Sequence, residues 1–203
     1  MSTTSRRSTI KLAILGLSVV SMVSPLAVYA ASDTDNTTIT ATVGTSISIT
    51  TSGTVSVTIT PSAGGAVSSN SDTVTVNTNN ATGYYLELAD ADASTNLVSG
   101  GNNIAAHSGT FASPTTLGNN TWGYRVDGVG GFGAGPTSAE TSNSSSTTIW
   151  AGVPASGSAT TLKTTASSAS NDVTTVWYGV KATSGQPNGA YADTVTYTAT
   201  TNP

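Results

Sequence analysis

Apolar and hydroxyl-bearing residues alternate along much of the chain. The segment TITATV (38–43) places Ile39, Ala41 and Val43 on one face and threonines on the other. A period of two residues is typical of β-strands with one buried face and one face in water. The same alternation recurs in three further segments, SISIT (46–50), TVSVTIT (54–60) and DTVTVNT (72–78). Clusters of Gly, Pro, Asn and Ser separate the segments, so the pattern predicts strands joined by turns.

Strand-like segments continue to the end of the chain, and no window beyond the first thirty residues has helical periodicity. The later candidates are GYYLELAD (83–90), TWGYRVDG (121–128), TIWAGVPA (148–155), TTVWYGVKA (174–182) and YADTVTYTATT (191–201). About nine strands predict an all-β fold over 31–203, a single antiparallel β-sandwich of the immunoglobulin-like kind, with a barrel as the alternative. We expect the Gly- and Ser-rich stretches 128–146 and 163–172 to be surface loops within that domain.

The first thirty residues have the composition of a signal-peptide helix. Arg6, Arg7 and Lys11 precede a largely apolar run over 12–28, and small residues lead up to Ala30. This arrangement predicts export and cleavage after Ala30.

Two alternatives concern how the chain is exported and held. The segment would stay as an N-terminal anchor if it were not cleaved, which Pro25 and the serines of the apolar run disfavour. The paired arginines resemble a twin-arginine signal, but Thr9 stands where that motif prefers a bulky apolar residue. We therefore expect ordinary secretion to the cell surface or the extracellular space.

Composition excludes several classes of function. Charged residues make up 8% of the chain and there is no cysteine, so disulfides and cysteine-based metal sites are excluded. Beyond the signal segment, three basic residues (Arg125, Lys163 and Lys181) stand against ten acidic ones. Nucleic-acid binding needs clustered cations to neutralise phosphates, so we expect no nucleic-acid partner and, after signal cleavage, no membrane partner.

Candidate chemistry is sparse. His107 is the single histidine and no Gly-x-Ser-x-Gly motif is present, so we predict no catalytic residues and no enzyme activity.

One loop has the spacing of a calcium site. Asp90, Asp92, Ser94 and Asn96 place oxygen-bearing side chains at alternate positions, as calcium loops do. The pattern lacks the glycine and the bidentate acid of an EF-hand, so a solvated polar loop is the favoured interpretation. We therefore expect no cofactor, with calcium at this loop as the alternative.

The tryptophans offer a candidate ligand surface. Trp122, Trp150 and Trp177 lie in strand-like segments, and together on one face they would stack against sugar rings. Aromatic residues of a sandwich more often fill its core, which is the favoured interpretation.

Two segments resemble the WxL-type cell-surface domains of bacteria, in which a strand carrying Trp-x-Leu is matched by a similar motif on the closing strand. The corresponding positions are Tyr84-Tyr85-Leu86, after a Gly-containing turn, and Tyr197-Thr198-Ala199. Tyrosine replaces tryptophan in both, and alanine replaces leucine in the second. The resemblance implies non-covalent attachment to cell-wall glycan through the β domain.

Three functions fit these features. The leading hypothesis is a non-enzymatic surface or secreted protein with a structural or adhesive role, bound to the cell wall or to other surface proteins. The second is a filament or matrix subunit, in which the strand 38–43 leaves its own sheet and completes that of a neighbour. The third is a carbohydrate-binding module that uses the tryptophans.

Overall fold

The computed structural model describes residues 30–203, so the predicted signal-peptide helix lies outside the described residues. The chain divides into two units, Met1–Thr42 and Val43–Pro203, and the second is compact. In the first unit, residues 30–42 form no strand and are exposed. Among the described residues, no helix is long and apolar enough to cross a membrane.

The compact unit is all-β, as predicted. Its strands are β1 (Ile47–Thr50), β2 (Ala66–Thr78), β3 (Tyr84–Asp90), β4 (Leu97–Ser99), β5 (Asn102–Ala106), β6 (Thr115–Thr116), β7 (Thr121–Val126), β8 (Ile149–Trp150), β9 (Thr160–Thr164), β10 (Ala169–Ala182) and β11 (Val195–Thr201). Among the described residues there are eleven strands where about nine were expected, and three of them have only two or three residues.

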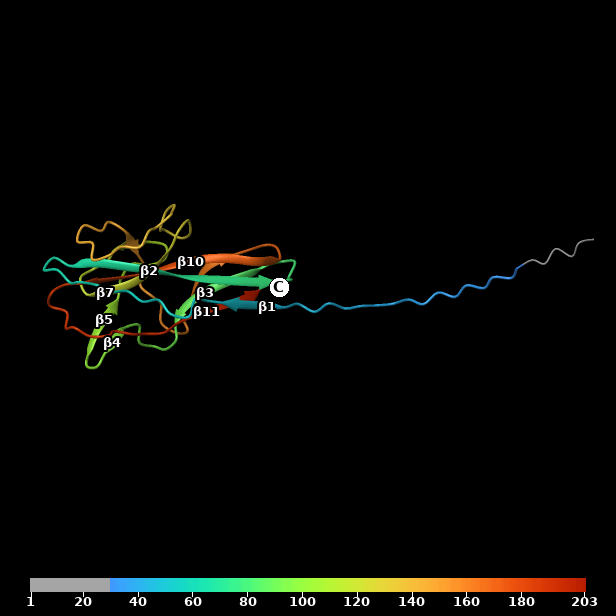
Figure 1. Cartoon of the computed structure of the whole chain (residues 1–203), viewed down its shortest axis with the longest axis horizontal. Helices are drawn as coiled ribbons and strands as arrows, with labels where there is room; N and C mark the ends of the chain where they lie inside the picture. The colour runs from blue at the N-terminus through green and yellow to red at the C-terminus, as the bar shows by residue number, and fades with distance from the viewer. Residues whose placement is uncertain (1–29) are drawn as a thin grey trace, which may run out of the picture. The chain divides into compact units, whose positions relative to one another are not determined.

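Two sheets form a sandwich-like arrangement (Figure 1). The larger has the order β1-β2-β10-β7-β5-β4 and the smaller has the order β11-β3-β9. A short pair, β6–β8, forms a third sheet. Neighbouring strands are antiparallel except for the parallel pair β5 and β7. The expectation of a purely antiparallel fold is therefore wrong for this one pair of strands.

The main core lies between the two larger sheets, and the alternation of each strand decides which side chains enter it. Tyr84, Leu86 and Leu88 project from β3, and all three are 0% exposed. Val74 and Val76 of β2 are equally buried. Burying a side chain of this size contributes about 1.5–3 kcal/mol relative to leaving it in water. The period of two in the sequence therefore identifies this core correctly.

The other face of the six-stranded sheet carries a second, smaller cluster. Val67, Leu117 and Trp150 are buried there, and Trp177 packs against them. Gly179 of β10 lies directly under the Trp150 indole, because a Cβ at this position would come within 2.7 Å of the ring. The glycine is thus required by the close approach of an aromatic side chain.

The segment 54–60, expected to be a strand, lies outside the sheets. It keeps its alternation, and its two valines pack against the main core, but it pairs with no strand. The cause is competition for the edge of β2. The backbone N–H groups of Val67 and Ser69 donate to the carbonyls of Asn143 and Glu140, each at 2.9 Å, so the loop occupies the ladder that 54–60 would have joined.

Two other expectations change in detail. The segment 148–155 contributes the two residues of β8, and Ala151 adds an isolated bridge to Tyr124 of β7. The stretch 163–172 is mostly strand, because β9 and β10 leave just 165–168 as a turn between them. The stretch 128–146 contains no strand, as expected of a loop, although Phe132 within it is buried in the main core.

Candidate functional site

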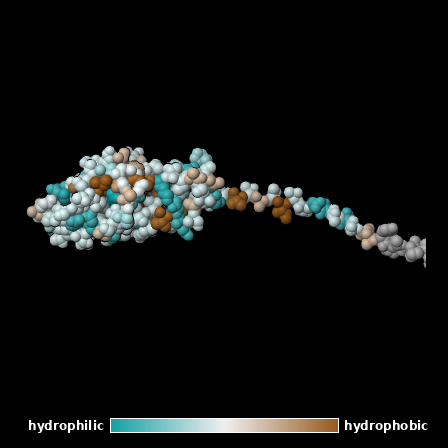
Figure 2. All heavy atoms as spheres, turned by 90° about the horizontal axis from the view of Figure 1, so that it is seen from above, coloured by the Kyte–Doolittle hydropathy of each residue, from teal (hydrophilic) through white to brown (hydrophobic). Residues whose placement is uncertain are grey.

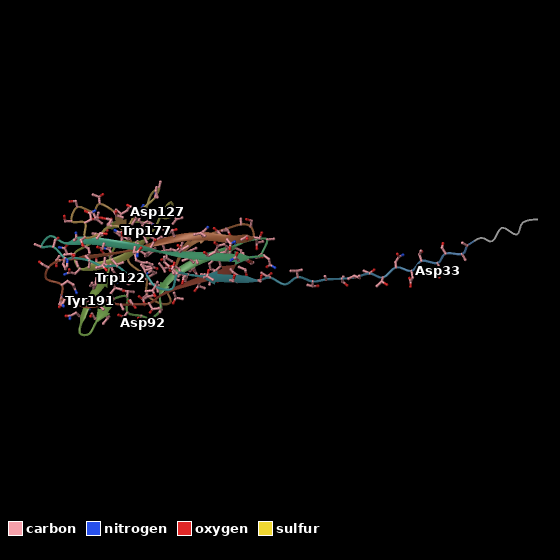
Figure 3. The ribbon with its side chains drawn as sticks, viewed as in Figure 1. Asp33, Asp92, Trp122, Asp127, Trp177 and Tyr191 are labelled. Carbon is pink, nitrogen blue, oxygen red and sulfur yellow. The ribbon has the colours of Figure 1, made fainter. Side chains whose placement is uncertain are left out.

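The three tryptophans have no common exposed face. Trp122 is 4% exposed and stacks on Tyr178 in the main core, with ring centres 6.3 Å apart. Trp150 is 0% exposed in the second cluster, and Trp177 packs beside it. The register between β7 and β10 puts Trp122 and Trp177 on opposite faces of the sheet (Figure 3). The three indoles therefore do not form a common stacking surface for sugar rings.

The residues of the candidate calcium loop do not converge. The Asp90 Oδ1 atom accepts from the Asp92 N–H at 3.1 Å, and the Asp92 Oδ1 atom accepts from the Ser94 N–H at 2.6 Å. These carboxylates cap a turn after β3, and Asn96 follows it without joining them. Within residues 30–203, no three His, Cys, Asp or Glu side chains lie close enough together to hold a metal.

A carboxyl pair that the sequence pattern did not indicate lies at the same end of β3. Asp193 precedes β11 and lies close to Asp90, a residue that is 1% exposed. The Oδ2 atoms of both groups are buried and have no hydrogen-bond partner among the described residues. Burial raises the pKa of Asp193, and the charges of Asp90 and Asp92 raise it further. The pairing depends on the long-range contact between β3 and β11, which no local motif reports.

His107 is held in a structural role. It is 8% exposed, its Nδ1 atom accepts the Gly118 N–H at 3.4 Å, and its Nε2 atom lies 2.8 Å from the Thr115 hydroxyl oxygen. With Nδ1 as acceptor, Nε2 carries the proton and donates to Thr115. Burial lowers the pKa of the imidazole, which favours this neutral form. Both ring nitrogens are therefore used in holding the loop that precedes β7.

Arg125 and Asp127 form an ion pair within the compact unit. An open polar hollow of about 510 Å³ lies beside Arg125 and Glu140. The Arg125 Nε atom is 2.7 Å from Asp127 Oδ1, and its Nη1 atom donates to the Phe132 carbonyl at 2.8 Å. Burial alone would raise the pKa of Asp127, but hydrogen bonds from Thr137 and Arg125 outweigh it and lower the pKa. Figure 3 shows Asp127 and Asp92 on opposite sides of the unit.

A second ion pair joins the two larger sheets. The Lys163 ammonium of β9 contacts the Asp172 carboxylate of β10, which also accepts the Tyr84 hydroxyl at 2.8 Å. Burial would raise the pKa of Asp172, but the bonds from Lys163 and Tyr84 lower it. These three residues form a cross-link between strands of different sheets.

The most unusual surface feature is the segment 38–43. Ile39 is 89% exposed and Val43 is 85% exposed, the highest values among the large hydrophobic residues that the structure describes. Figure 2 shows hydrophobic atoms, in brown, on the stretch of chain that precedes the compact unit. No strand of the described residues pairs with this segment. It therefore combines an apolar face, a hydroxyl face and an unpaired backbone, which are the properties of a strand without a sheet.

The chain is clamped at the point where it enters the compact unit. The Asn79 side chain accepts the Ser46 N–H at 2.8 Å and donates to the Gly44 carbonyl at 2.9 Å. The Thr78 hydroxyl donates to the Ser46 carbonyl at 2.7 Å. The amide of Asn79 thus takes the place of a neighbouring strand residue and keeps 44–46 extended. Sequence reasoning missed this clamp, because its two sides are more than thirty residues apart.

The strand β11 is an open edge of the smaller sheet. It pairs with β3 on one side and is the last strand of its sheet on the other. Val195, Tyr197 and Ala199 pack against the main core but are only partly buried. The Tyr197 hydroxyl lies 2.6 Å from that of Tyr178, which fixes the β11 face toward the core. β1, the edge strand of the larger sheet, lies beside β11 (Figure 1).

The two segments that carry the WxL resemblance lie on neighbouring strands, with Leu86 directly opposite Ala199 in the β3–β11 ladder. Comparison with protein-family models, with curated proteins and with solved structures finds no match to this chain. Inference about its function therefore depends on its own residues, and the exposed strand-like segment 38–43 is the feature that most needs a functional reason.

Proposed function

We propose that this chain is an exported, non-enzymatic subunit with an immunoglobulin-like β-sandwich, which assembles outside the cell by strand donation. The observation that carries the proposal is the exposed, alternating segment 38–43, with Ile39 and Val43 in water. An extended segment of this kind adds to a sheet edge through main-chain hydrogen bonds, and its alternate side chains give specificity. The predicted export signal supports assembly at the cell surface.

The composition of the segment supports the same function. Residues 36–46 contain no charged side chain, and seven of the residues in 37–46 are Thr, Ser or Gly. The threonine face keeps the free segment compatible with water, while the Ile39 face supplies apolar surface for a partner. An unpaired strand without charges is a template for association, which most monomeric proteins avoid.

The test compares two deletions in the mature protein. Removal of 31–43 takes away the proposed donor strand, whereas removal of 31–36 shortens only the polar lead. We expect the first deletion to abolish polymers, seen by size-exclusion chromatography and electron microscopy, while the second retains them. Circular dichroism checks that both variants keep their β structure. Polymers that persist after removal of 31–43 would show that donation of this strand does not build them.

A peptide provides an independent test that leaves the protein unchanged. A synthetic peptide of residues 37–46 should occupy the acceptor edge and slow polymerisation of the intact chain. A matched peptide with Ile39→Ser and Val43→Ser should have little effect, since it retains the backbone but loses the apolar face. Equal inhibition by both peptides would contradict recognition through that face.

Attachment to the cell wall is a second candidate function. The observation that favours it is the pairing of the two motif-like segments, in which Leu86 lies opposite Ala199. If the WxL resemblance extends to function, the mature protein should sediment with purified cell walls. The proposal would be abandoned if the protein stayed in solution at every wall concentration.

A further inference from the structure

We infer that the acceptor of the donated strand is the outer edge of β11 on a second copy of this chain. This inference rests on the proposed strand donation and adds the site at which it takes place. It is carried by the backbone pattern of β11, by its half-buried apolar side chains and by the clamp at Asn79.

The backbone of β11 presents alternate residues to solvent. The Ala91 N–H donates to the Thr194 carbonyl at 2.9 Å, and the Asn202 N–H donates to the Gly83 carbonyl at 3.0 Å. These two bonds fix the even-numbered residues of the ladder as those that bond to β3. The N–H and C=O groups of Val195, Tyr197 and Ala199 therefore point away from β3, toward the side on which the sheet has no further strand.

The side chains of these same residues are incompletely covered. Val195, Tyr197 and Ala199 remain partly exposed, although Leu86 and Leu88 of the adjacent β3 are 0% exposed. A further strand beside β11 would cover the remaining apolar surface and satisfy the outward backbone groups together. β11 has no charged residue, proline or bulge to prevent this addition.

Two other sheet edges are protected. β4 is covered, because the Val98 N–H donates to the Ala192 carbonyl at 3.0 Å and the Ala192 N–H donates back at 3.1 Å. β9 carries Lys163 in an ion pair with Asp172, and a charge on an edge strand is a common protection against strand addition. The remaining edges, β1 and β11, lack such protection, and β11 with its seven residues is the longer of the two, since β1 has four.

The segment 38–43 fits this edge in length and pattern. Six residues at roughly 3.3 Å each span about 20 Å, which matches a strand such as β11. Ile39, Ala41 and Val43 recur every second residue, as do Val195, Tyr197 and Ala199 on β11. Both segments are uncharged, so their pairing involves no burial of charge. A second copy of the chain therefore provides a suitable occupant.

The clamp favours donation to a second copy over folding back. A hairpin onto the chain's own β1 would need a turn within the three residues between 43 and 47. Asn79 bonds to Gly44 and Ser46 instead, which holds that stretch extended. A tight turn back onto β1 is thus disfavoured, which leaves the segment available to a second copy.

Disulfide trapping tests the acceptor, since the natural chain has no cysteine. One variant carries Thr40→Cys on the threonine face of the donor. It is mixed with variants that carry a single cysteine on the same face of β11, at Thr196, Thr198 or Thr200. A Thr161→Cys variant on β9 is the matched control. Under mild oxidation we expect covalent dimers with at least one β11 variant and none with the control. Cross-linking to β9 in preference to β11 would overturn the inference.

Amide hydrogen exchange gives a second readout that needs no substitution. Addition of the 37–46 peptide to the intact monomer should slow exchange at Val195, Tyr197 and Ala199 by about tenfold or more, because their N–H groups gain partners. The amides of Thr196 and Thr198 already bond to β3 and should change much less. Unchanged exchange at the three outward amides would refute β11 as the acceptor. Assembly that needs 38–43 but leaves β11 unprotected would refute this inference alone, whereas assembly without 38–43 would refute the proposed function.

Discussion

Replacement of Ile39 by serine should weaken assembly without affecting the stability of the subunit. The side chain is 89% exposed in the free chain, so it contributes little to the folded compact unit. In the donated state the same side chain would lie against the apolar row of β11. The substitution therefore acts on the complex alone.

The size of the effect follows from the apolar surface of Ile39 that strand donation would remove from water. Nearly the whole isoleucine side chain is available for burial, and such burial contributes about 1.5–3 kcal/mol. Each 1.4 kcal/mol corresponds to about a tenfold change in affinity, so Ile39→Ser should raise the critical concentration for assembly by about 10- to 150-fold. Thr40→Ser is the matched control, since Thr40 lies on the hydroxyl face, and it should change the critical concentration by about twofold or less.

Sedimentation over a range of protein concentrations measures the critical concentration, and thermal unfolding of the dilute monomer checks the subunit. Ile39→Ser should leave the monomer transition unchanged to within about 0.5 kcal/mol. An unchanged critical concentration would refute burial of Ile39 in the assembly. A clearly destabilised monomer would show that Ile39 packs within its own subunit, and the reasoning from its exposure would then be wrong.

Three further predictions concern the compact unit. Gly179→Ala should destabilise the fold by about 1–3 kcal/mol in denaturant unfolding, since its Cβ would come within 2.7 Å of the Trp150 ring. Gly64→Ala is the matched control. A Cβ at Gly64 meets no atom within 4 Å, so this substitution should be nearly neutral. The pKa of Asp193 is raised above its ordinary value of 3.8, so this carboxyl binds a proton more tightly in the folded state than in the unfolded state. Its contribution to stability therefore falls as the pH rises from about 3.8 through the folded pKa. Asp193→Asn should therefore gain stability relative to the natural chain as the pH increases. The pKa of Asp172 is lowered, so its contribution to folding stability is present above the ordinary pKa and is lost in acid. The loss of stability caused by Asp172→Asn should therefore be largest at neutral pH and should shrink below pH 3.8. Unfolding measured at pH 3, 5 and 7 separates these two opposite trends.

Alternation in the sequence predicted several strands, at the edge of a sheet as well as inside it, and indicated which face of each is buried. β3 is an example, since its inward residues Tyr84, Leu86 and Leu88 are all fully buried. The pattern failed for 54–60, which alternates equally well but is not in a sheet. Periodicity reports which face of a segment prefers to be buried, but it does not report whether a neighbouring edge is free. At β2 the loop around Asn143 occupies that edge, and this contact joins residues far apart in the sequence.

The candidate sites show the same limit. The spacing of Asp90, Asp92 and Ser94 suggested a shared ligand, but short Asp side chains bond to the backbone two residues on and cap the turn instead. The contact of Asp90 with Asp193 arises only when β11 pairs with β3. Similarly, Trp122 and Trp177 resemble each other in sequence context. In the β7–β10 register they are an odd number of positions apart, so their side chains lie on opposite faces of the sheet.

The exposed segment and the open edge are better explained together than separately. An unprotected edge strand favours association, and an exposed apolar strand does the same, so either feature alone would be a liability for a monomeric protein. The chain protects β4 with Ala192 and β9 with Lys163, but β11 has no such protection. Asn79 in turn holds 44–46 extended, where a turn would have let Ile39 and Val43 approach β1 of their own subunit. A chain that protects β4 and β9, leaves the longer edge of β11 open and carries an unpaired strand-like segment has the arrangement expected of a subunit that is completed by its neighbour.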